Sequence, residues 1–271
     1  MVKNWFHVDQ LDSSTYRIHE PYYWQANNEY LLIGTERALL FDSGPGRRDI
    51  LPIVRGLTDL PLLVLASHSH YDHIGNHRRL KQLAEARILS ADIPATKSMT
   101  IAQEICPPLT ARLSLLPRPF MVDEWLPRGG SIDLGNRSVE MIELPGHTSD
   151  SVGIIDRSQG FVFVGDFIYN GARKSEATFL LGALPTSDAV DYLRSSRRLR
   201  EIRDGARILG GHCDAEVDPR RLDDLVAALE NAMSSDARRS LLPFSVVNSG
   251  GTSLVVSSRQ IRTASNGHQS R

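Results

Sequence analysis

Residues 67–73 read SHSHYDH and place three imidazoles and a carboxylate between His68 and His73, in an H-x-H-x-D-H pattern. The preceding run, residues 61–66 (PLLVLA), is apolar and β-prone and predicts a buried strand. His68 and His70 can then point the same way, because side chains on a strand alternate with a period of two. Neutral imidazoles and carboxylates suit zinc, and also iron or manganese, so the stretch predicts a metal site rather than a histidine-rich loop.

Three later strand ends each supply one more residue that can bind a metal. Each of three later runs contains apolar residues and passes through glycine into a histidine or an aspartate, namely Val139–His147, Phe161–Asp166 and Arg207–His212. Glycine at such a place allows close approach of the backbone to a bound ion. One histidine after a strand is usually an ordinary loop residue, but four such strand ends in one chain predict a shared metal centre.

With these residues, the chain resembles the metallo-β-lactamase fold superfamily, which includes glyoxalase II-like thioesterases and N-acyl-homoserine lactonases. The resemblance covers roughly residues 30 to 215. It rests on Phe41–Gly44, the H-x-H-x-D-H run, Pro145–Thr148, Gly165-Asp166 and Gly211-His212. It implies an α/β fold, a four-layer αβ/βα sandwich of two similar halves with metals at one edge. We expect a single domain over residues 1–262 and a disordered tail over residues 263–271.

The resemblance also implies a set of metal ligands and two divalent ions, zinc before iron or manganese. The expected ligands are His68, His70 and His147 for the first ion, Asp72, His73 and His212 for the second, and Asp166 as the bridge. Asp42 is expected to orient a ligand imidazole, a role that tunes metal affinity. The alternative for Asp42 is an ordinary turn aspartate after a strand.

Two residues are predicted to take part in the reaction. In the family, a hydroxide formed between two metals at neutral pH attacks a carbonyl group. Lactonases of the family have a tyrosine three residues after the bridging aspartate, which makes Tyr169 the candidate donor to the developing oxyanion. The alternative for Tyr169 is a buried tyrosine at a strand end. Asp72 is expected to bind metal and also to handle the proton of the nucleophile or leaving group.

These expectations predict a dinuclear metal-dependent hydrolase that cleaves an ester, thioester or lactone of small size. A β-lactam hydrolase is the nearest alternative, and an iron-dependent persulfide dioxygenase-like oxidoreductase is an alternative from another class. A metal-poor interaction protein on the same fold is disfavoured, because the full ligand set is present. Cys213 could be suspected as a soft ligand, but lactamases that use cysteine have it where this chain has Asp166, so we expect a bystander.

Several segments are candidates for setting specificity. Pro21–Trp24 is predicted to form an apolar substrate wall, or else an aromatic staple on the core edge. Pro94–Pro119 is interpreted as a surface insertion, with a lid as the alternative, and Tyr169–Pro185 is predicted to line the site. The arginines of Arg194–Arg203 predict a charge-balanced helix face, with a site for coenzyme A phosphates as the alternative.

Composition limits the partners and the location. The 271 residues carry a formal net charge of −1, which gives no reason to expect a nucleic-acid partner. The start lacks the long apolar segment of a signal peptide, and no stretch is long enough to span a membrane. Cys106 and Cys213 are therefore expected to be reduced thiols in a cytoplasmic protein. The oligomeric state is not predicted.

The hydrophobic pattern predicts alternating strands and helices. The predicted strands are residues 30–33, 38–42, 61–66, 88–90, 152–156, 161–165 and 208–209. The predicted helices are residues 47–57, 78–86, 188–203 and 219–233, and residues 243–247 and 254–256 are predicted to form a terminal hairpin.

Overall fold

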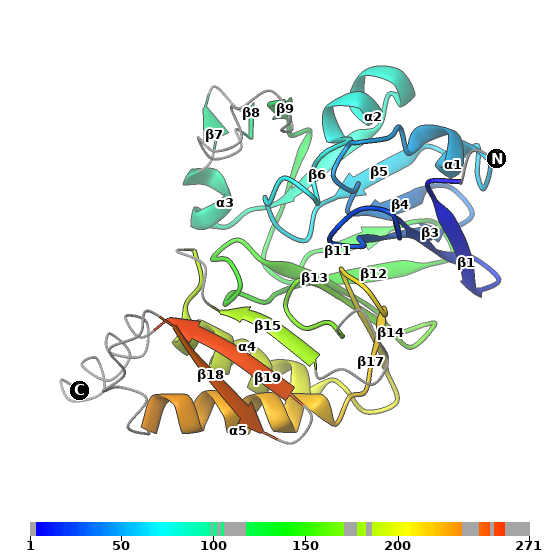
Figure 1. Cartoon of the computed structure of the whole chain (residues 1–271). Helices are drawn as coiled ribbons and strands as arrows, with labels where there is room; N and C mark the ends of the chain where they lie inside the picture. The colour runs from blue at the N-terminus through cyan, green and yellow to red at the C-terminus, as the bar shows by residue number, and fades with distance from the viewer. Residues whose placement is uncertain are drawn as a thin grey trace. The chain divides into compact units, whose positions relative to one another are not determined.

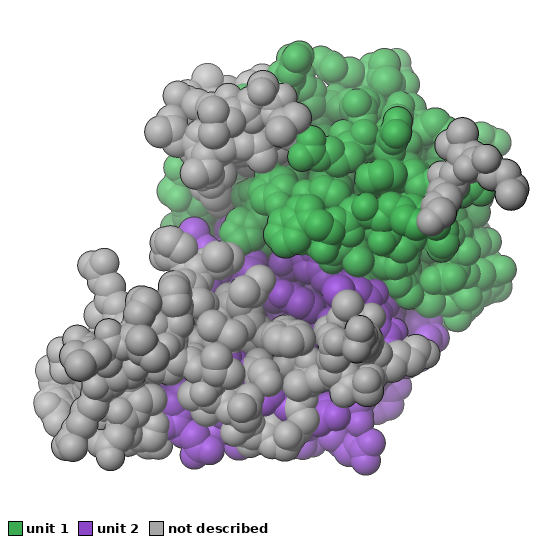
Figure 2. All heavy atoms as spheres, viewed as in Figure 1, with its two compact units in different colours: residues 1–142, 154–159 green, residues 143–153, 160–271 purple. Residues whose placement is uncertain are grey.

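The computed structural model describes residues 4–98, 100–101, 104–105, 118–170, 178–182, 186–234, 244–249 and 252–257. Its contacts divide the chain into two compact units, which Figure 2 colours separately. Unit 1 comprises residues 1–142 and 154–159, and unit 2 comprises residues 143–153 and 160–271. The H-x-H-x-D-H run therefore belongs to unit 1, while His147, Asp166 and His212 belong to unit 2.

Unit 1 contains a seven-stranded mixed sheet with the order β1-β2-β3-β4-β5-β6-β10 (Figure 1). Neighbours from β1 to β4 are antiparallel, and those from β4 to β10 are parallel. The strands are β1 (His7–Asp12), β2 (Thr15–His19), β3 (Asn28–Ile33), β4 (Ala38–Phe41), β5 (Leu62–Leu65), β6 (Arg87–Ala91) and β10 (Glu124–Leu126). The predictions for residues 30–33, 38–42, 61–66 and 88–90 are confirmed to within two residues at each end.

Two helices cover one face of this sheet. Every residue of β4 and β5 is buried, as expected of parallel strands that read as continuous apolar runs. Helices α1 (Leu51–Arg55) and α2 (His77–Ala84) add Val54 and Leu80 to the core formed by the sheet. Helix α1 is shorter than predicted, because the Asp49 carboxylate accepts the Leu51 N–H and the preceding residues form a loop tied to Asn76.

The other elements of unit 1 are short. They are α3 (Pro94–Ser98), β7 (Thr100–Ile101), β8 (Glu104–Ile105), β9 (Phe120–Met121), β11 (Ser131–Asp133) and β12 (Ser138–Glu143), whose last residue falls in unit 2. Strands β7, β8 and β9 form a small antiparallel sheet. Most of the segment between β8 and β9 lies outside the described residues, and so do Cys106 and the choice between a lid and a surface insertion.

A six-stranded sheet has the order β11-β12-β13-β14-β16-β17. Its later strands are β13 (Val152–Asp156), β14 (Phe161–Gly165), β16 (Arg207–Gly210) and β17 (Glu216–Val217). Strand β14 pairs in parallel with β16, which pairs antiparallel with β17. The predictions for β13, β14 and β16 are confirmed, because these strands keep a buried apolar run between turn residues.

Unit 2 also contains two helices and a three-stranded sheet. Helix α4 (Ala189–Glu201) begins after Asp188, whose carboxylate accepts the N–H groups of Val190 and Asp191 as an N-cap. Helix α5 (Arg221–Ser234) packs against α4 and along β18 (Phe244–Ser249) and β19 (Thr252–Ser257), as Figure 1 shows. The predicted terminal hairpin is confirmed, since β18 and β19 are antiparallel, and β15 (Thr178–Gly182) pairs with β19.

Each predicted ligand follows a strand end. The H-x-H-x-D-H run follows β5, His147 follows β12, Asp166 follows β14 and His212 follows β16. The predicted tail over residues 263–271 and most of the loop after Asn170 lie outside the described residues. Within the described residues, no helix combines the length and the apolar character that a membrane span requires.

Candidate metal centre

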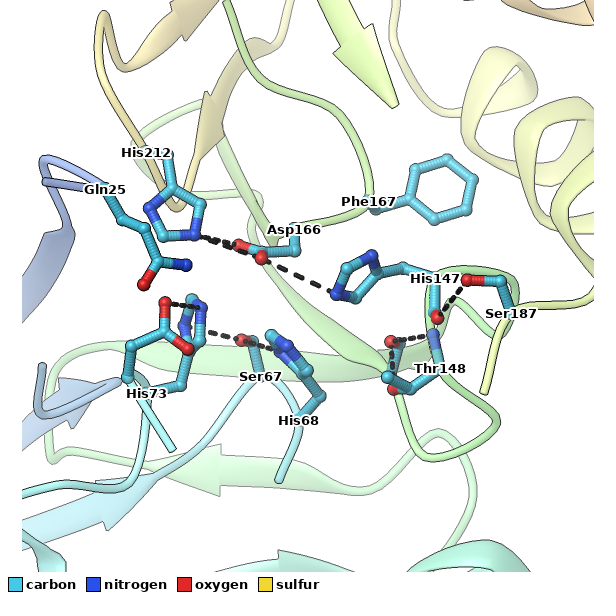
Figure 3. Close-up of polar contacts among 12 residues, drawn as sticks. Gln25, Ser67, His68, His73, His147, Thr148, Asp166, Phe167, Ser187 and His212 are labelled. Atoms are coloured by element: carbon cyan, nitrogen blue, oxygen red, sulfur yellow. Dashed lines mark hydrogen bonds and ion pairs between the residues drawn. The ribbon is translucent and has the colours of Figure 1, made fainter. Parts of the chain in front are cut away.

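The histidines of unit 1 are oriented by one buried carboxylate and one hydroxyl. Asp42 Oδ2 lies 2.8 Å from His73 Nδ1 and accepts the Ser67 hydroxyl at 2.9 Å. A carboxylate only accepts, so His73 carries its proton on Nδ1 and its lone pair on Nε2. The Ser67 hydroxyl gives its proton to Asp42, so at 3.0 Å it accepts from His68 Nδ1 (Figure 3). Both imidazoles are thereby held with Nε2 as the basic nitrogen, the form that binds a metal.

Asp42 itself is held in an unusual backbone conformation. Its φ is 65°, in the left-handed region, directly after the last residue of β4. The Ser67 N–H donates to Asp42 Oδ1 at 2.6 Å, so the two ends of neighbouring strands β4 and β5 are joined by this side chain. The predicted contact between Asp42 and a candidate ligand imidazole is present in the structure.

Asp72 is also positioned by a distant residue. The Asn27 amide donates to the Asp72 backbone oxygen at 2.9 Å and to its carboxylate at 3.3 Å. Asp72 Oδ2 lies 3.6 Å from His73 Nε2, so the two candidate ligands of the second ion face each other. No sequence motif indicated that Asn27 contacts Asp72, because the two residues are 45 positions apart in the sequence.

In unit 2, Asp166 lies between two histidines. Its carboxylate is 3.6 Å from His147 Nε2 and 3.0 Å from His212 Nε2, and Figure 3 shows it between the two rings. All three side chains are buried. An acidic group that reaches one imidazole on each side has the placement that a bridging ligand needs.

The backbone around these ligands is fixed by residues that the sequence did not indicate. The Ser187 hydroxyl donates to the His147 backbone oxygen at 2.8 Å, and the buried Tyr192 hydroxyl donates to the Phe167 oxygen at 2.6 Å. A Cβ on Gly146 would lie 2.6 Å from the Tyr192 ring, so glycine before His147 permits close contact with helix α4.

Two groups of side chains are of the kinds that could each hold one metal ion. They are His68, His70, His147 and Asp166, and separately Asp72, His73 and His212. Imidazole nitrogens and carboxylate oxygens fit zinc, iron or manganese, and an all-oxygen set for calcium or magnesium is absent from these two groups. Cys213 belongs to neither group.

Tyr169, the predicted oxyanion donor, is buried after β14. Its ring meets the His212 ring edge-on, with centroids 5.2 Å apart. Its position beside a candidate ligand is compatible with the predicted role and with a packing role, so the catalytic assignment stays a prediction.

Most arginines of α4, and Arg203 just after its end, are paired with acids. Arg194 pairs with Asp191, Arg197 with Glu230, and Arg200 and Arg203 with Asp223. The prediction of a charge-balanced helix face is confirmed. These four arginines therefore do not form a ready site for phosphates.

Two buried acids of unit 1, Glu20 and Glu29, lie close to Gly44. Glu20 Oε1 and Glu29 Oε1 lie 2.3 and 2.7 Å from the position that a Cβ on Gly44 would take. Burial raises the pKa of Glu20 to about 7. Burial, followed by the charges of Glu20 and Asp42, raises the pKa of Glu29 well above its usual value. Glu29 therefore favours its protonated form near neutral pH, and Glu20 changes its charge in that range.

Comparison with known proteins agrees with the predicted family and fold. A family model described as the metallo-beta-lactamase superfamily matches residues 22–212. The chain belongs to this superfamily, whose members include metal-dependent hydrolases, and the predicted fold class is confirmed.

Similar curated proteins include an acyl-coenzyme A thioesterase and a hydroxyacylglutathione hydrolase. The acyl-coenzyme A thioesterase MBLAC2 of Gallus gallus is 29% identical over 279 residues, which cover 92% of this chain and 98% of that protein. The hydroxyacylglutathione hydrolase GloC of Haemophilus influenzae is 27% identical, over 70% of this chain and 86% of that protein.

A solved structure is similar in fold. The metallo-beta-lactamase from Pontibacter korlensis matches with a TM-score of 0.63 and 17% identity, over 83% of this chain and 99% of that chain. At this level of identity the likeness concerns the fold alone.

Proposed function

We propose that this protein is a dinuclear metal-dependent hydrolase of thioesters. The observation that carries the proposal is the set of seven candidate ligands, in which Asp166 lies next to both His147 and His212. In this proposal the first ion is held by His68, His70 and His147, the second by Asp72, His73 and His212, and Asp166 bridges them. Zinc is the proposed metal.

Two such ions, when bound, would lower the pKa of a water molecule to around 7 and polarise a carbonyl oxygen. The overall reaction adds one water across the acyl–sulfur bond. The C–S bond breaks, and a carboxylic acid and a thiol are released. Esters and lactones would react in the same way, with an alcohol in place of the thiol.

The chain's own residues have separate tasks in this reaction. Asp42 and Ser67 keep two imidazoles in the tautomer that offers Nε2. Asp72, aligned by Asn27, takes or returns the proton of the nucleophile or the leaving group. The Tyr169 hydroxyl donates a hydrogen bond to the oxyanion that develops on the acyl carbon.

A thioester is favoured over a β-lactam by the relatives rather than by the fold. The relatives named acyl-coenzyme A thioesterase of Gallus gallus and hydroxyacylglutathione hydrolase of Haemophilus influenzae align over 92% and 70% of this chain. The structural likeness to β-lactamases, at under 20% identity, gives no information about the substrate.

The test combines metal analysis with a substrate panel. The purified protein is reconstituted with zinc before the measurements. It is then expected to contain two metals per chain and to hydrolyse acyl thioesters faster than lactones, aryl esters or nitrocefin. Asp166→Ala is expected to lose metal and activity together. The matched control Asp218→Ala removes an aspartate that pairs with the exposed Arg220, and it is expected to retain both metal and activity. One iron per chain with oxygen uptake on a persulfide would instead establish the dioxygenase alternative.

A further inference from the structure

We propose that His77 is a positioning residue for the metal centre, which acts through the Ser43 hydroxyl to fix the backbone of the candidate ligand His73. The inference deepens the proposed function and rests on it for the role of His73 as a metal ligand. All three residues belong to unit 1. No sequence motif indicated His77, which lies just beyond the H-x-H-x-D-H run.

His77 is a buried polar residue at the start of helix α2. It is the first residue of the helix and is 1% exposed. Its Nδ1 lies 2.7 Å from the Ser43 hydroxyl oxygen, and its ring packs against Phe120 with ring centroids 4.8 Å apart. Burial lowers the pKa of His77 to about 3, so the imidazole is neutral near pH 7 and carries one proton.

The contacts of the His77 ring decide which nitrogen carries that proton. Within the described residues, the buried Nε2 has no hydrogen-bond partner, whereas Nδ1 faces Ser43. A proton on Nε2 would leave a buried N–H without an acceptor, and such groups are rare in folded proteins. His77 therefore donates from Nδ1 to the Ser43 hydroxyl oxygen.

The Ser43 hydroxyl connects His77 with the backbone of His73. Its oxygen also accepts the Asn76 backbone N–H at 3.1 Å, so both of its lone pairs are occupied. The hydroxyl itself donates to the His73 backbone oxygen at 3.3 Å, and the Ser43 N–H donates to the same oxygen at 2.8 Å. Ser43 therefore holds the His73 carbonyl with two donors.

His73 is thereby held at its side chain and at its backbone by two consecutive residues. Asp42 orients the imidazole by accepting from Nδ1 at 2.8 Å, and Ser43, the next residue, holds the backbone oxygen. A side chain offers its nitrogen at a fixed point only if the backbone that carries it is fixed as well. The ion that we assign to His73 therefore depends on Ser43 and on the residue that orients the Ser43 hydroxyl.

Asn76 gives a separate indication that the start of α2 serves to hold Ser43. Asn76 occupies the N-cap position, but its side chain makes no capping hydrogen bond. Its amide donates instead to the Ser43 backbone oxygen at 2.8 Å and to the Arg48 oxygen at 3.1 Å. Asparagine is a preferred N-cap residue, so the helix lacks a stabilising contact that its sequence could provide, and the loop of Ser43 gains one.

The first experiment measures stepwise zinc binding to the metal-free protein. His77→Phe keeps an aromatic ring against Phe120 but removes the donor. We expect it to lower the affinity for the ion assigned to His73 about tenfold and to leave the other ion unaffected. His77→Asn should restore most of the affinity, because its amide nitrogen lies near the place of Nδ1. The longer side chain in His77→Gln places its amide near Nε2 and should not restore it.

Two controls separate positioning from stability. Ser43→Ala should lower the same affinity, and adding His77→Phe should lower it no further, because His77 acts through the missing hydroxyl. Leu80→Ala removes a buried leucine of the same helix, so it should lower the unfolding temperature and leave both zinc affinities unchanged. Wild-type affinity in His77→Phe, additive effects in the double variant, equal rescue by asparagine and glutamine, or a tenfold loss of zinc affinity in Leu80→Ala would overturn the proposal.

The second experiment needs no metal. The Ser43 amide hydrogen, which donates to His73, is followed by hydrogen exchange in the metal-free protein, relative to that of the buried Leu40 in β4. We expect about tenfold faster relative exchange in His77→Phe and recovery in His77→Asn, and an unchanged rate would overturn the proposal. If the exchange behaves as expected but the protein binds fewer than two metals or hydrolyses no thioester, the proposed function is wrong and the link from His77 to His73 stands.

Discussion

Replacing Asp42 with asparagine is expected to weaken metal binding without unfolding the protein. The Asp42 carboxylate accepts three hydrogen bonds, from His73 Nδ1 at 2.8 Å and from the N–H and hydroxyl of Ser67 at 2.6 and 2.9 Å. An asparagine keeps one acceptor oxygen and turns the other position into an NH2 donor. In either orientation, the NH2 group would face an N–H or O–H donor, because both carboxylate oxygens now accept.

The size of the effect follows from these contacts. Losing one charge-assisted hydrogen bond in a buried place costs about 1.5–3 kcal/mol. If the lost hydrogen bond is the one to His73, the ring is no longer held in place and its Nε2 becomes less basic. Removing a residue that orients a metal ligand typically lowers metal affinity about 10–100-fold. We therefore expect zinc affinity about 10–100-fold lower, with the loss concentrated on the ion that we assign to His73.

The assay is a competition titration of the metal-free protein with zinc and a chromophoric chelator, together with metal counting after dialysis. Asp156→Asn is the matched control, because Asp156 is an equally buried carboxylate that binds Arg137 rather than a candidate ligand. That control should lower the unfolding temperature but leave zinc affinity unchanged. If Asp42→Asn retains two zinc ions with wild-type affinity, the tautomer argument for His73 is wrong.

Three further predictions concern the reaction and its pH dependence. Tyr169→Phe should lower kcat on the best thioester by about 10²-fold with metal content unchanged, and an unaltered kcat would remove Tyr169 from the mechanism. Asp72→Ala should lose one metal and most of the activity, so full activity with two metals would refute its assignment. The raised pKa of Glu20, about 7 against 4.5, means that the folded state binds the proton more tightly. The resulting stability is complete below about pH 4.5 and is lost as pH rises through 7, a change of about 3 kcal/mol. Glu20→Gln should flatten the dependence of the unfolding free energy on pH between 5 and 8. The free energy is measured by urea unfolding at each pH, and an equal pH dependence in the variant and the wild type would contradict this prediction.

The candidate metal ligands could be predicted from the sequence, because each follows a local pattern of consecutive residues. The run from His68 to His73 and the glycine-preceded residues His147, Asp166 and His212 all follow short apolar strands, and the structure has a strand end before each. Strand patterns of this kind are local, because burial repeats along a few consecutive residues. The candidate ligands could therefore be named without knowing how the strands are arranged.

The residues that orient the ligands could not be predicted in the same way. Asn27 reaches Asp72 across 45 positions, and Ser187 reaches the His147 backbone across 40. Asparagine and serine are common loop residues, so their types carry no signal without the three-dimensional contact. Helix α1 shows the same limit, because the contacts of Asn76 decide that the residues before Leu51 form a loop rather than a longer helix.

The two kinds of similarity carry different information about the substrate. The strands and their ends belong to the fold itself, and a β-lactamase structure shares this fold with a TM-score of 0.63 at only 17% identity. The loops beside those ends are free to change without disturbing the strands, since they lie outside the core. In this chain the loop of Trp24 and the loop of Arg47 are both tied to the segment that carries His70 and Asp72. Substitutions in these loops can therefore alter substrate preference in the proposed reaction, while the candidate ligands keep their places at the strand ends.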